Sequence, residues 1–247
     1  MFAIDLQNIH KTYAGSTSPA LNGVHLQIKE DCIFGLLGPN GAGKSTTISL
    51  MSGLIQADLG EVCIFNKNIK QHLFDIKYQI GIVPQEYALF PTLTCYENLR
   101  YFGNLYGLRG ASLKQKIKDY LLLFGLEKNE DKLISSFSGG MKRRVNLIAG
   151  ILHDPKLIIL DEPTVGVDVQ SRKMIIDFLK NYQREKKITI LYTSHHLEEA
   201  QEFCDDIAII DHGKILIEGQ PKALIQQYQV KNLESLFINL TGYSVRE

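Results

Sequence analysis

The residues best suited to chemistry form a glycine-rich loop that ends in a lysine and a serine. Residues 38–45 read Gly-Pro-Asn-Gly-Ala-Gly-Lys-Ser and match the pattern G-x-x-x-x-G-K-[ST] in full. Glycines let successive backbone N–H groups turn toward phosphate oxygens, and a helix N-terminus adds positive potential. In such a loop Lys44 reaches the β- and γ-phosphates, and the Ser45 hydroxyl ligates Mg²⁺. A plain glycine-rich turn is the alternative, but a strand is expected before the loop and a helix after it.

Two adjacent carboxylates follow an apolar strand later in the chain. Residues 157–160 are all apolar, and Asp161 and Glu162 come directly after them. A buried strand of this kind aims Asp161 at the coordination sphere of Mg²⁺. Glu162 lies one residue further on, where it can polarise an attacking water. A helix cap or surface acid is the alternative interpretation, which the glycine-rich loop makes the weaker one. Together the two motifs predict a P-loop nucleoside triphosphatase.

A second phosphate-binding device is expected at residues 137–141. Ser138 is predicted to cap a helix, and Gly139 and Gly140 expose backbone N–H groups at its positive end. One nucleotide cannot easily use both this device and the first loop of the same chain. We therefore expect two chains, each presenting its Ser138 segment to the γ-phosphate bound by the other. Glycine-containing helix starts without such a role are also common.

The elements that must position these motifs describe an α/β fold interrupted by helices. Residues 2–6 and 24–28 alternate like half-buried antiparallel strands, whereas residues 33–37 form a continuous apolar run before the loop. A helix is predicted over residues 43–54. Helical periodicity dominates residues 94–152, where Ser112 is the expected N-cap of a helix through Phe124.

Strands return in the last third, at residues 157–160, 188–192 and 207–210, with helices between them. This alternation predicts a parallel sheet with helices on both faces, so the fold is a mixed sheet flanked by helices, with an N-terminal antiparallel β subdomain and a helical insertion. We expect one domain, 1–247. Its RecA-like and β core is assigned to 1–86 and 156–220, the helical subdomain to 87–155, and a C-terminal helical extension to 221–247.

Composition limits the partners. The chain has 247 residues, and its 27 Lys+Arg balance 27 Asp+Glu, so no global attraction to nucleic acid is expected. The four cysteines, far apart in sequence, suit reduced thiols of a cytosolic protein better than a metal site. Asp5 interrupts the N-terminal segment, and no apolar run reaches roughly 18 residues, so neither a signal peptide nor a membrane span is expected.

In their order along the chain, these motifs resemble those of the nucleotide-binding subunits of ABC transporters, over nearly the whole chain. The resemblance implies an ATPase that uses ATP and Mg²⁺ and dimerises around two ATPs with a second copy or a homologous subunit. It also implies a separate membrane-spanning permease, and a cytoplasmic, peripheral location on the inner face of the cell membrane. Phe137, Met141 and the sequence Val165-Gly166-Val167-Asp168 depart from the usual residues and resemble bacterial exporters of drugs, lipids or polysaccharides.

The same resemblance implies roles for single residues. Glu162, His195, Lys44 and Gln85 are the implied catalytic residues, and Ser45, Gln85 and Asp161 the implied metal ligands. Tyr13 matches the aromatic residue that stacks on adenine, Asp168 the loop at the dimer interface, and His195 the switch histidine that contacts the γ-phosphate. The implied nucleotide-binding set is Tyr13, Gly38, Pro39, Asn40, Gly41, Ala42, Gly43, Lys44, Ser45, Thr46, Gln85, Ser138, Gly139, Gly140, Asp168 and His195.

Other functions stay open at this point. A soluble ABC-type ATPase of translation or DNA repair would usually join two cassettes or carry a long coiled coil, whereas this chain has one cassette and no heptad run. An inactive regulatory module would lack Glu162, His195 or Lys44, and all three are present. A GTPase is disfavoured because residues 66–69, Asn-Lys-Asn-Ile, lack the Asp of the guanine-reading motif.

Three further segments carry weaker expectations. Residues 142–144, Lys-Arg-Arg, are predicted to form a solvated helix face, with a contact to phosphate or a partner as the alternative. A C-terminal stripe at helical spacing is predicted to pack on the core, with partner docking as the alternative. Residues 85–99 carry Tyr87, Leu89, Phe90 and Leu93, and we predict that this segment couples ATP to the membrane partner. Packing of the insertion onto the core is the competing interpretation.

Overall fold

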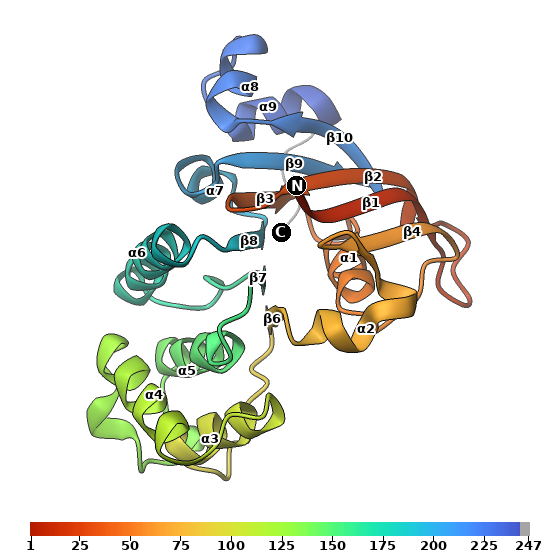
Figure 1. Cartoon of the computed structure of the whole chain (residues 1–247). Helices are drawn as coiled ribbons and strands as arrows, with labels where there is room; N and C mark the ends of the chain where they lie inside the picture. Colours follow the sequence, from red (N-terminus) through yellow and green to blue (C-terminus); the bar gives the residue numbers. More distant parts are fainter. Residues whose placement is uncertain (243–247) are drawn as a thin grey trace.

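A six-stranded sheet forms the centre of the protein, in the order β10-β9-β3-β8-β7-β6 (Figure 1). The computed structural model describes residues 1–242. Five strands are parallel, and only the edge strand β10 pairs antiparallel, with β9. The strands are β3 (Ile33–Leu37), β6 (Ile80–Val83), β7 (Leu157–Asp161), β8 (Thr189–Ser194), β9 (Asp206–Asp211) and β10 (Lys214–Gly219). Every residue of β3 and β8 is buried, as expected of strands covered on both faces. The predicted mixed α/β fold is confirmed.

A four-stranded antiparallel sheet lies beside this core, in the order β2-β1-β4-β5. Its strands are β1 (Phe2–Lys11), β2 (Leu21–Lys29), β4 (Leu59–Ile64) and β5 (Lys67–Asn68). The alternating apolar residues of β1 and β2 share one hydrophobic cluster with helix α1 (Lys44–Met51) and with inward residues of β3 and β7. Helix α1 is therefore held between the two sheets, which fixes the loop at its N-terminus.

Helix α1 ends earlier than the sequence predicted. Its last residue is Met51, and Ser52 is the C-cap. Gly53 follows with φ +69°, a left-handed conformation that glycine adopts without steric cost. The helix therefore stops before residue 54. Helix α2 (Ile69–Lys77) comes next along the chain, capped by the Asn68 side chain, which accepts from the N–H of Lys70.

The helical insertion forms a lobe at the end of the core marked by β6, away from the antiparallel sheet (Figure 1). It contains α3 (Cys95–Leu105), α4 (Gly110–Leu123) and α5 (Gly139–Ile151), with short 3₁₀ turns at Glu127–Asn129 and Ile134–Ser136. Thr94 caps α3 in a reciprocal box with Glu97. The predicted cap at Ser112 is wrong: α4 begins at Gly110 after Arg109, which makes no side-chain cap, so Ser112 lies within the first turn.

The remaining helices are α6 (Val169–Lys186), α7 (Leu197–Phe203), α8 (Pro221–Gln227) and α9 (Leu233–Thr241). Helix α9 buries Leu233, Leu236 and Phe237 completely, while Leu240 is partly buried. This confirms that the C-terminal stripe packs on the core. The end of the extension assigned to 221–247 lies outside the described residues. Within residues 1–242, no helix combines the length and apolar character that crossing a membrane requires.

Candidate active site

The glycine-rich loop connects β3 to α1 and is shaped by left-handed glycines. Gly41 has φ +81° and Gly43 has φ +114°. A Cβ on Gly38 would lie 2.1 Å from the carbonyl oxygen of Ile210, so the loop backbone sits directly against β9. Helix α1 starts straight after Gly43 and has no side-chain cap, so its first N–H groups have no side-chain acceptor. Such a helix start fits a bound phosphate.

Lys44 is turned inward from the first position of α1. Its side chain is 5% exposed, and its Nζ donates to the carbonyl oxygens of Gly38 at 2.7 Å and Pro39 at 3.2 Å. The same Nζ lies 3.2 Å from Oε1 of Glu162, whose side chain is also 5% exposed. A buried ammonium is thereby held directly behind the loop that offers the free N–H groups.

Glu162 lies between a lysine and a histidine. While Oε1 faces Lys44, Oε2 is 2.7 Å from Nδ1 of His195. The backbone of Glu162 is left-handed, with φ +48°, and its N–H lies 3.2 Å from both the carbonyl oxygen and the hydroxyl of Thr193. Since Glu162 follows β7 and His195 follows β8, the parallel pairing of these two strands brings both side chains to the same edge of the sheet.

Asp161 and Ser45 form the oxygen-rich part of the site. Oδ1 of Asp161 accepts a 2.8 Å hydrogen bond from the hydroxyl of Thr193. Burial raises the pKa of Asp161, and the hydroxyls of Thr193 and the nearby Ser45 oppose that rise. Within residues 1–242, no group of three or more His, Cys, Asp or Glu could hold a metal. One carboxylate and one hydroxyl nevertheless suit Mg²⁺, which keeps water and phosphate ligands.

Thr193 is a site residue that sequence reasoning did not single out. Its hydroxyl contacts Asp161, and its carbonyl oxygen accepts from Glu162. The available signal was its position just before His195, combined with a parallel register that places Thr193 opposite Asp161. That register depends on pairing between strands nearly thirty residues apart, so the motif alone does not reveal it.

Tyr13 lies at the outer side of the loop. Its hydroxyl is 3.3 Å from Oγ1 of Thr46, in the third position of α1, and the residue is 45% exposed. An exposed aromatic face beside a phosphate-binding loop can stack on a flat base. The predicted nucleotide residues Tyr13 and Thr46 are thus brought together with the loop of residues 38–45.

A second group of predicted site residues gathers at the start of α5. Ser138 caps this helix by accepting from the N–H of Met141 at 3.3 Å. Asp168 caps α6 in the same way, accepting from the N–H and hydroxyl of Ser171 at 2.9 and 2.7 Å. A Cβ on Gly140 would lie 2.6 Å from Oγ of Ser171 and 3.0 Å from Oδ2 of Asp168. The two helix starts therefore touch, and only a glycine fits between them.

Gln85 belongs with this second group rather than with Lys44 and Glu162. It is exposed, just after β6, and its carbonyl oxygen accepts a 2.7 Å hydrogen bond from Arg143 on α5. A hollow of about 610 Å³ lies beside it, bordered also by Tyr87, Pro91 and Val165. Within the described part of the chain, no hydrogen bond joins the Gln85 side chain to the Lys44 cluster.

The prediction that residues 142–144 form a solvated face is wrong. Arg143 is only 3% exposed, and Arg144 is partly buried and donates to the carbonyl oxygen of Phe124 at 2.7 Å. Lys142 is partly exposed and, of the three residues, comes closest to the predicted solvated face. The physical reason is helical geometry: consecutive residues point about 100° apart, so three in a row cannot share one face.

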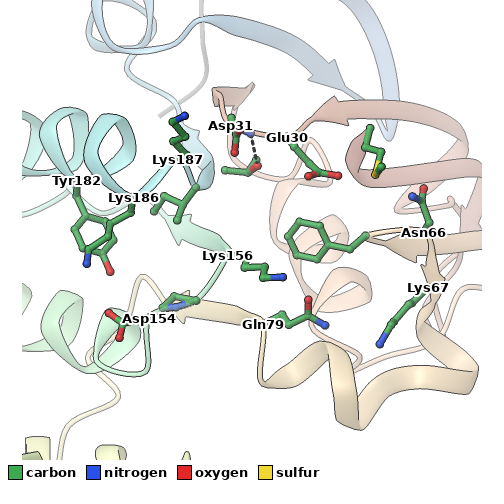
Figure 2. A pocket seen from close by; sticks show the side chains of 15 residues that line it. Glu30, Asp31, Asn66, Lys67, Gln79, Asp154, Lys156, Tyr182, Lys186 and Lys187 are labelled. Atoms are coloured by element: carbon green, nitrogen blue, oxygen red, sulfur yellow. Dashed lines mark hydrogen bonds between the residues drawn. The ribbon is translucent and has the colours of Figure 1, made fainter. Parts of the chain in front are cut away.

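Another hollow, of about 630 Å³, lies at the opposite edge of the central sheet (Figure 2). Its lining includes Asp31, Lys156 and Thr189, close to the amino ends of β3, β7 and β8. The N–H of Asp31 donates to the Thr189 hydroxyl at 3.0 Å. Both lysines and carboxylates line this hollow, and none of the predicted site residues lines it. The chemistry-bearing residues are at the carboxyl edge, as parallel sheets usually place them.

Fold and site together define a P-loop nucleoside triphosphatase. Comparison with known proteins specifies the family. The ABC transporter family model matches residues 21–165. A linearmycin resistance ATP-binding protein of Bacillus subtilis is 45% identical over 87% of this chain and 68% of that protein. A Nod factor export ATP-binding protein of Ralstonia nicotianae is 35% identical over 90% of this chain and 68% of that protein.

Similar solved structures support the same family assignment. The ATP-binding subunit of an ABC transporter superposes with a TM-score of 0.87 and 28% identity, covering 97% of this chain and 99% of that one. A dimeric ATP-binding cassette in a post-hydrolysis state, bound to ADP and phosphate, superposes with a TM-score of 0.80 and 28% identity. The match covers 88% of this chain and 98% of that one. The chain therefore belongs to the ABC transporter family, as an ATP-binding subunit that hydrolyses ATP.

Proposed function

We propose that this chain hydrolyses Mg²⁺-ATP at the carboxyl edge of its central sheet and thereby powers export through a separate membrane-spanning subunit. The observation that supports the site most directly is the buried Glu162 carboxylate, held between Lys44 and His195 and adjacent to Asp161. Among residues 1–242, Glu162 alone combines a position beside the metal-facing carboxylate with contacts to both a cation and an imidazole. We assign it the role of general base toward the attacking water.

The other residues bind and orient. Lys44 and the N–H groups of residues 41–46 hold the phosphates, and Tyr13 stacks on adenine. Ser45 and Asp161 would hold Mg²⁺, with Gln85 as a further ligand when its segment approaches. When bound, the metal supplies charge neutralisation on the β- and γ-phosphate oxygens. His195 contacts one oxygen of Glu162, and we assign it the further role of donating to the γ-phosphate.

A complete site is proposed to need two chains. Gly140 packs against Asp168 and Ser171, and Tyr87 donates to the carbonyl oxygen of Gly139 at 3.2 Å, so this end of α5 is occupied by residues other than Lys44 and its neighbours. The dimeric relative bound to ADP and phosphate supports the same arrangement. The partner is a second copy or a homologous subunit, each chain offering Ser138, Gly139 and Gly140 to the other's nucleotide.

Mixing two inactive variants tests the shared site. Lys44→Ala destroys the phosphate loop, and Ser138→Arg blocks the helix start. In a mixed dimer one site carries both defects and the other carries none. With random pairing, half the dimers are mixed and one of two sites is intact, so about a quarter of wild-type ATPase should return. If both variants fold and pair but the mixture stays inactive, the shared site is refuted.

The membrane partner is proposed to dock next to Gln85. Phe90 and Tyr101 are 42% and 43% exposed, and their rings contact each other edge to face with centroids 5.0 Å apart. Leu89 and Pro91, on either side of Phe90 in the sequence, line the hollow at Gln85. An exposed aromatic pair beside a hollow suits an apolar helix of another protein. We place the subunit peripherally on the inner face of the cell membrane. Relatives named for linearmycin resistance and Nod factor export support an exported cargo.

A further inference from the structure

The buried guanidinium of Arg143 holds the backbone that carries Gln85. Arg143 lies one turn into α5 and is 3% exposed. Nη1 donates to the carbonyl oxygen of Pro84 at 3.0 Å, and Nη2 donates to that of Gln85 at 2.7 Å. A planar guanidinium presents its N–H donors in a rigid fork that matches two successive carbonyls, whereas the lysine ammonium is a point charge on a flexible stem. The two bonds fix the direction of the peptide between Pro84 and Gln85.

Further contacts from α5 grip the same short segment. Asn146, one turn after Arg143, donates to the Pro84 carbonyl at 3.2 Å and accepts from the N–H of Ala88 at 3.2 Å. The Tyr87 ring lies 4.9 Å beneath the Arg143 guanidinium, and its hydroxyl donates to the Gly139 carbonyl. Residues 84–88 are thus attached to α5 at both ends and in the middle, although they follow directly from the core strand β6.

A purely structural role is a poor explanation for a charge at this position. Among the described residues, no carboxylate lies within 4.0 Å of Arg143, and its buried Nε has no hydrogen-bond partner. Burial lowers the pKa of the guanidinium, which shows the cost of placing a cation there. Volume-matched apolar side chains often stabilise such positions as well or better. What an apolar residue cannot do is hold two backbone carbonyls.

We propose that Arg143 is a positioning residue for ATP hydrolysis: it makes residues 84–88 move with α5, so that Gln85 and the Ser138 helix start reach their nucleotides as one body. This inference depends on the role proposed for Gln85. Misplacing a ligand by about 1 Å can lower a rate by about two orders of magnitude, so a loosened segment should lower kcat.

The variant that tests this is Arg143→Met, which keeps length and apolar packing but removes both donors. Lys142→Met on the same helix is the matched control, since Lys142 makes no hydrogen bond to residues 84–88 in the structure. We expect at least a tenfold lower kcat for Arg143→Met, an unchanged melting temperature and ATP affinity, and faster hydrogen exchange confined to residues 84–90. Arg143→Lys should also lose kcat, because it keeps the charge without the rigid planar fork that sets the direction of the two carbonyls. Lys142→Met should match wild type in every measurement.

A Gln85→Ala variant separates this proposal from the one on which it rests. If Gln85 acts as proposed, Gln85→Ala alone lowers kcat, and adding Arg143→Met lowers it little further. If Gln85→Ala lowers kcat and Arg143→Met does not, the positioning role is refuted and the Gln85 role stands. If both variants leave kcat unchanged while exchange in residues 84–90 rises, the Gln85 role is refuted, and with it the positioning role. A fall in melting temperature that accounts for the lost activity would also refute it.

Discussion

Replacing Glu162 by glutamine should separate hydrolysis from nucleotide binding. The amide has the same shape, so the left-handed backbone and the bonds to Thr193 persist, but it cannot take a proton from water. Losing a positioned base lowers a rate by ~10²–10⁴-fold, which corresponds to ~3–5 kcal/mol of activation free energy. ATP affinity should not fall, because Glu162 lies 3.2 Å from Lys44 and competes with phosphate for its charge.

Glu162→Gln should also lower the stability of the fold by a limited amount. Removing one member of a buried ion pair is costly, but Lys44 keeps the Gly38 and Pro39 carbonyls as acceptors. We therefore expect the free energy of unfolding without nucleotide to fall by only ~1–3 kcal/mol. Glu198→Gln, an exposed carboxylate on α7, is the matched control. The assays are phosphate release at saturating ATP, titration calorimetry and chemical denaturation. A wild-type rate, or lost ATP binding in a folded variant, would refute the reasoning.

Three other outcomes are expected. Lys44→Ala should lose ATP affinity itself, because Lys44 is the one basic residue of the loop formed by residues 38–45; equal affinities by calorimetry would contradict this. The chain should be monomeric at micromolar concentration without nucleotide, since the polar surfaces around Ser138 and Asp168 bury poorly without ATP between them, and light scattering that shows a stable dimer would count against this. Phe90→Ala should keep basal ATPase and lose transport in the assembled complex, because Asn98 holds the Phe90 backbone while the ring stays exposed; lost ATPase or unfolding would make Phe90 a core residue.

What the sequence could predict was the part whose geometry is local. The loop of residues 38–45 needs only its own glycines and the helix that follows, and Ser138 needs only the N–H of Met141 three residues on. Both were correctly placed at helix starts. The apolar runs of β3 and β7 likewise predict strands that are buried on two faces. In each case the physical cause lies within a few residues of the pattern that revealed it.

What could not be predicted depends on contacts between distant segments. Arg143 looked like part of a charged surface because the carbonyls that it binds are almost sixty residues away in sequence. Ser112 looked like a cap, but Gly110, with φ +65°, starts the helix two residues earlier. Composition predicts neither the burial of Arg143 nor the start of α4 at Gly110, because both depend on backbone groups, which every residue carries.

A carboxylate outside every recognised motif ties the loops of the site together. Oε1 of Glu199, on α7, accepts a 2.8 Å hydrogen bond from Thr164, two residues after Glu162, and another from the buried hydroxyl of Tyr192 on β8. Its other oxygen lies 3.7 Å from Nε of Arg172, in the first turn of α6 after Asp168. The segments that carry Glu162, Asp168 and His195 therefore all contact the Glu199 carboxylate. A shift of one segment moves a group that the other two also contact. Motif residues are proposed to contact the nucleotide, whereas residues such as Glu199 and Arg143 hold the segments that carry those motif residues in place.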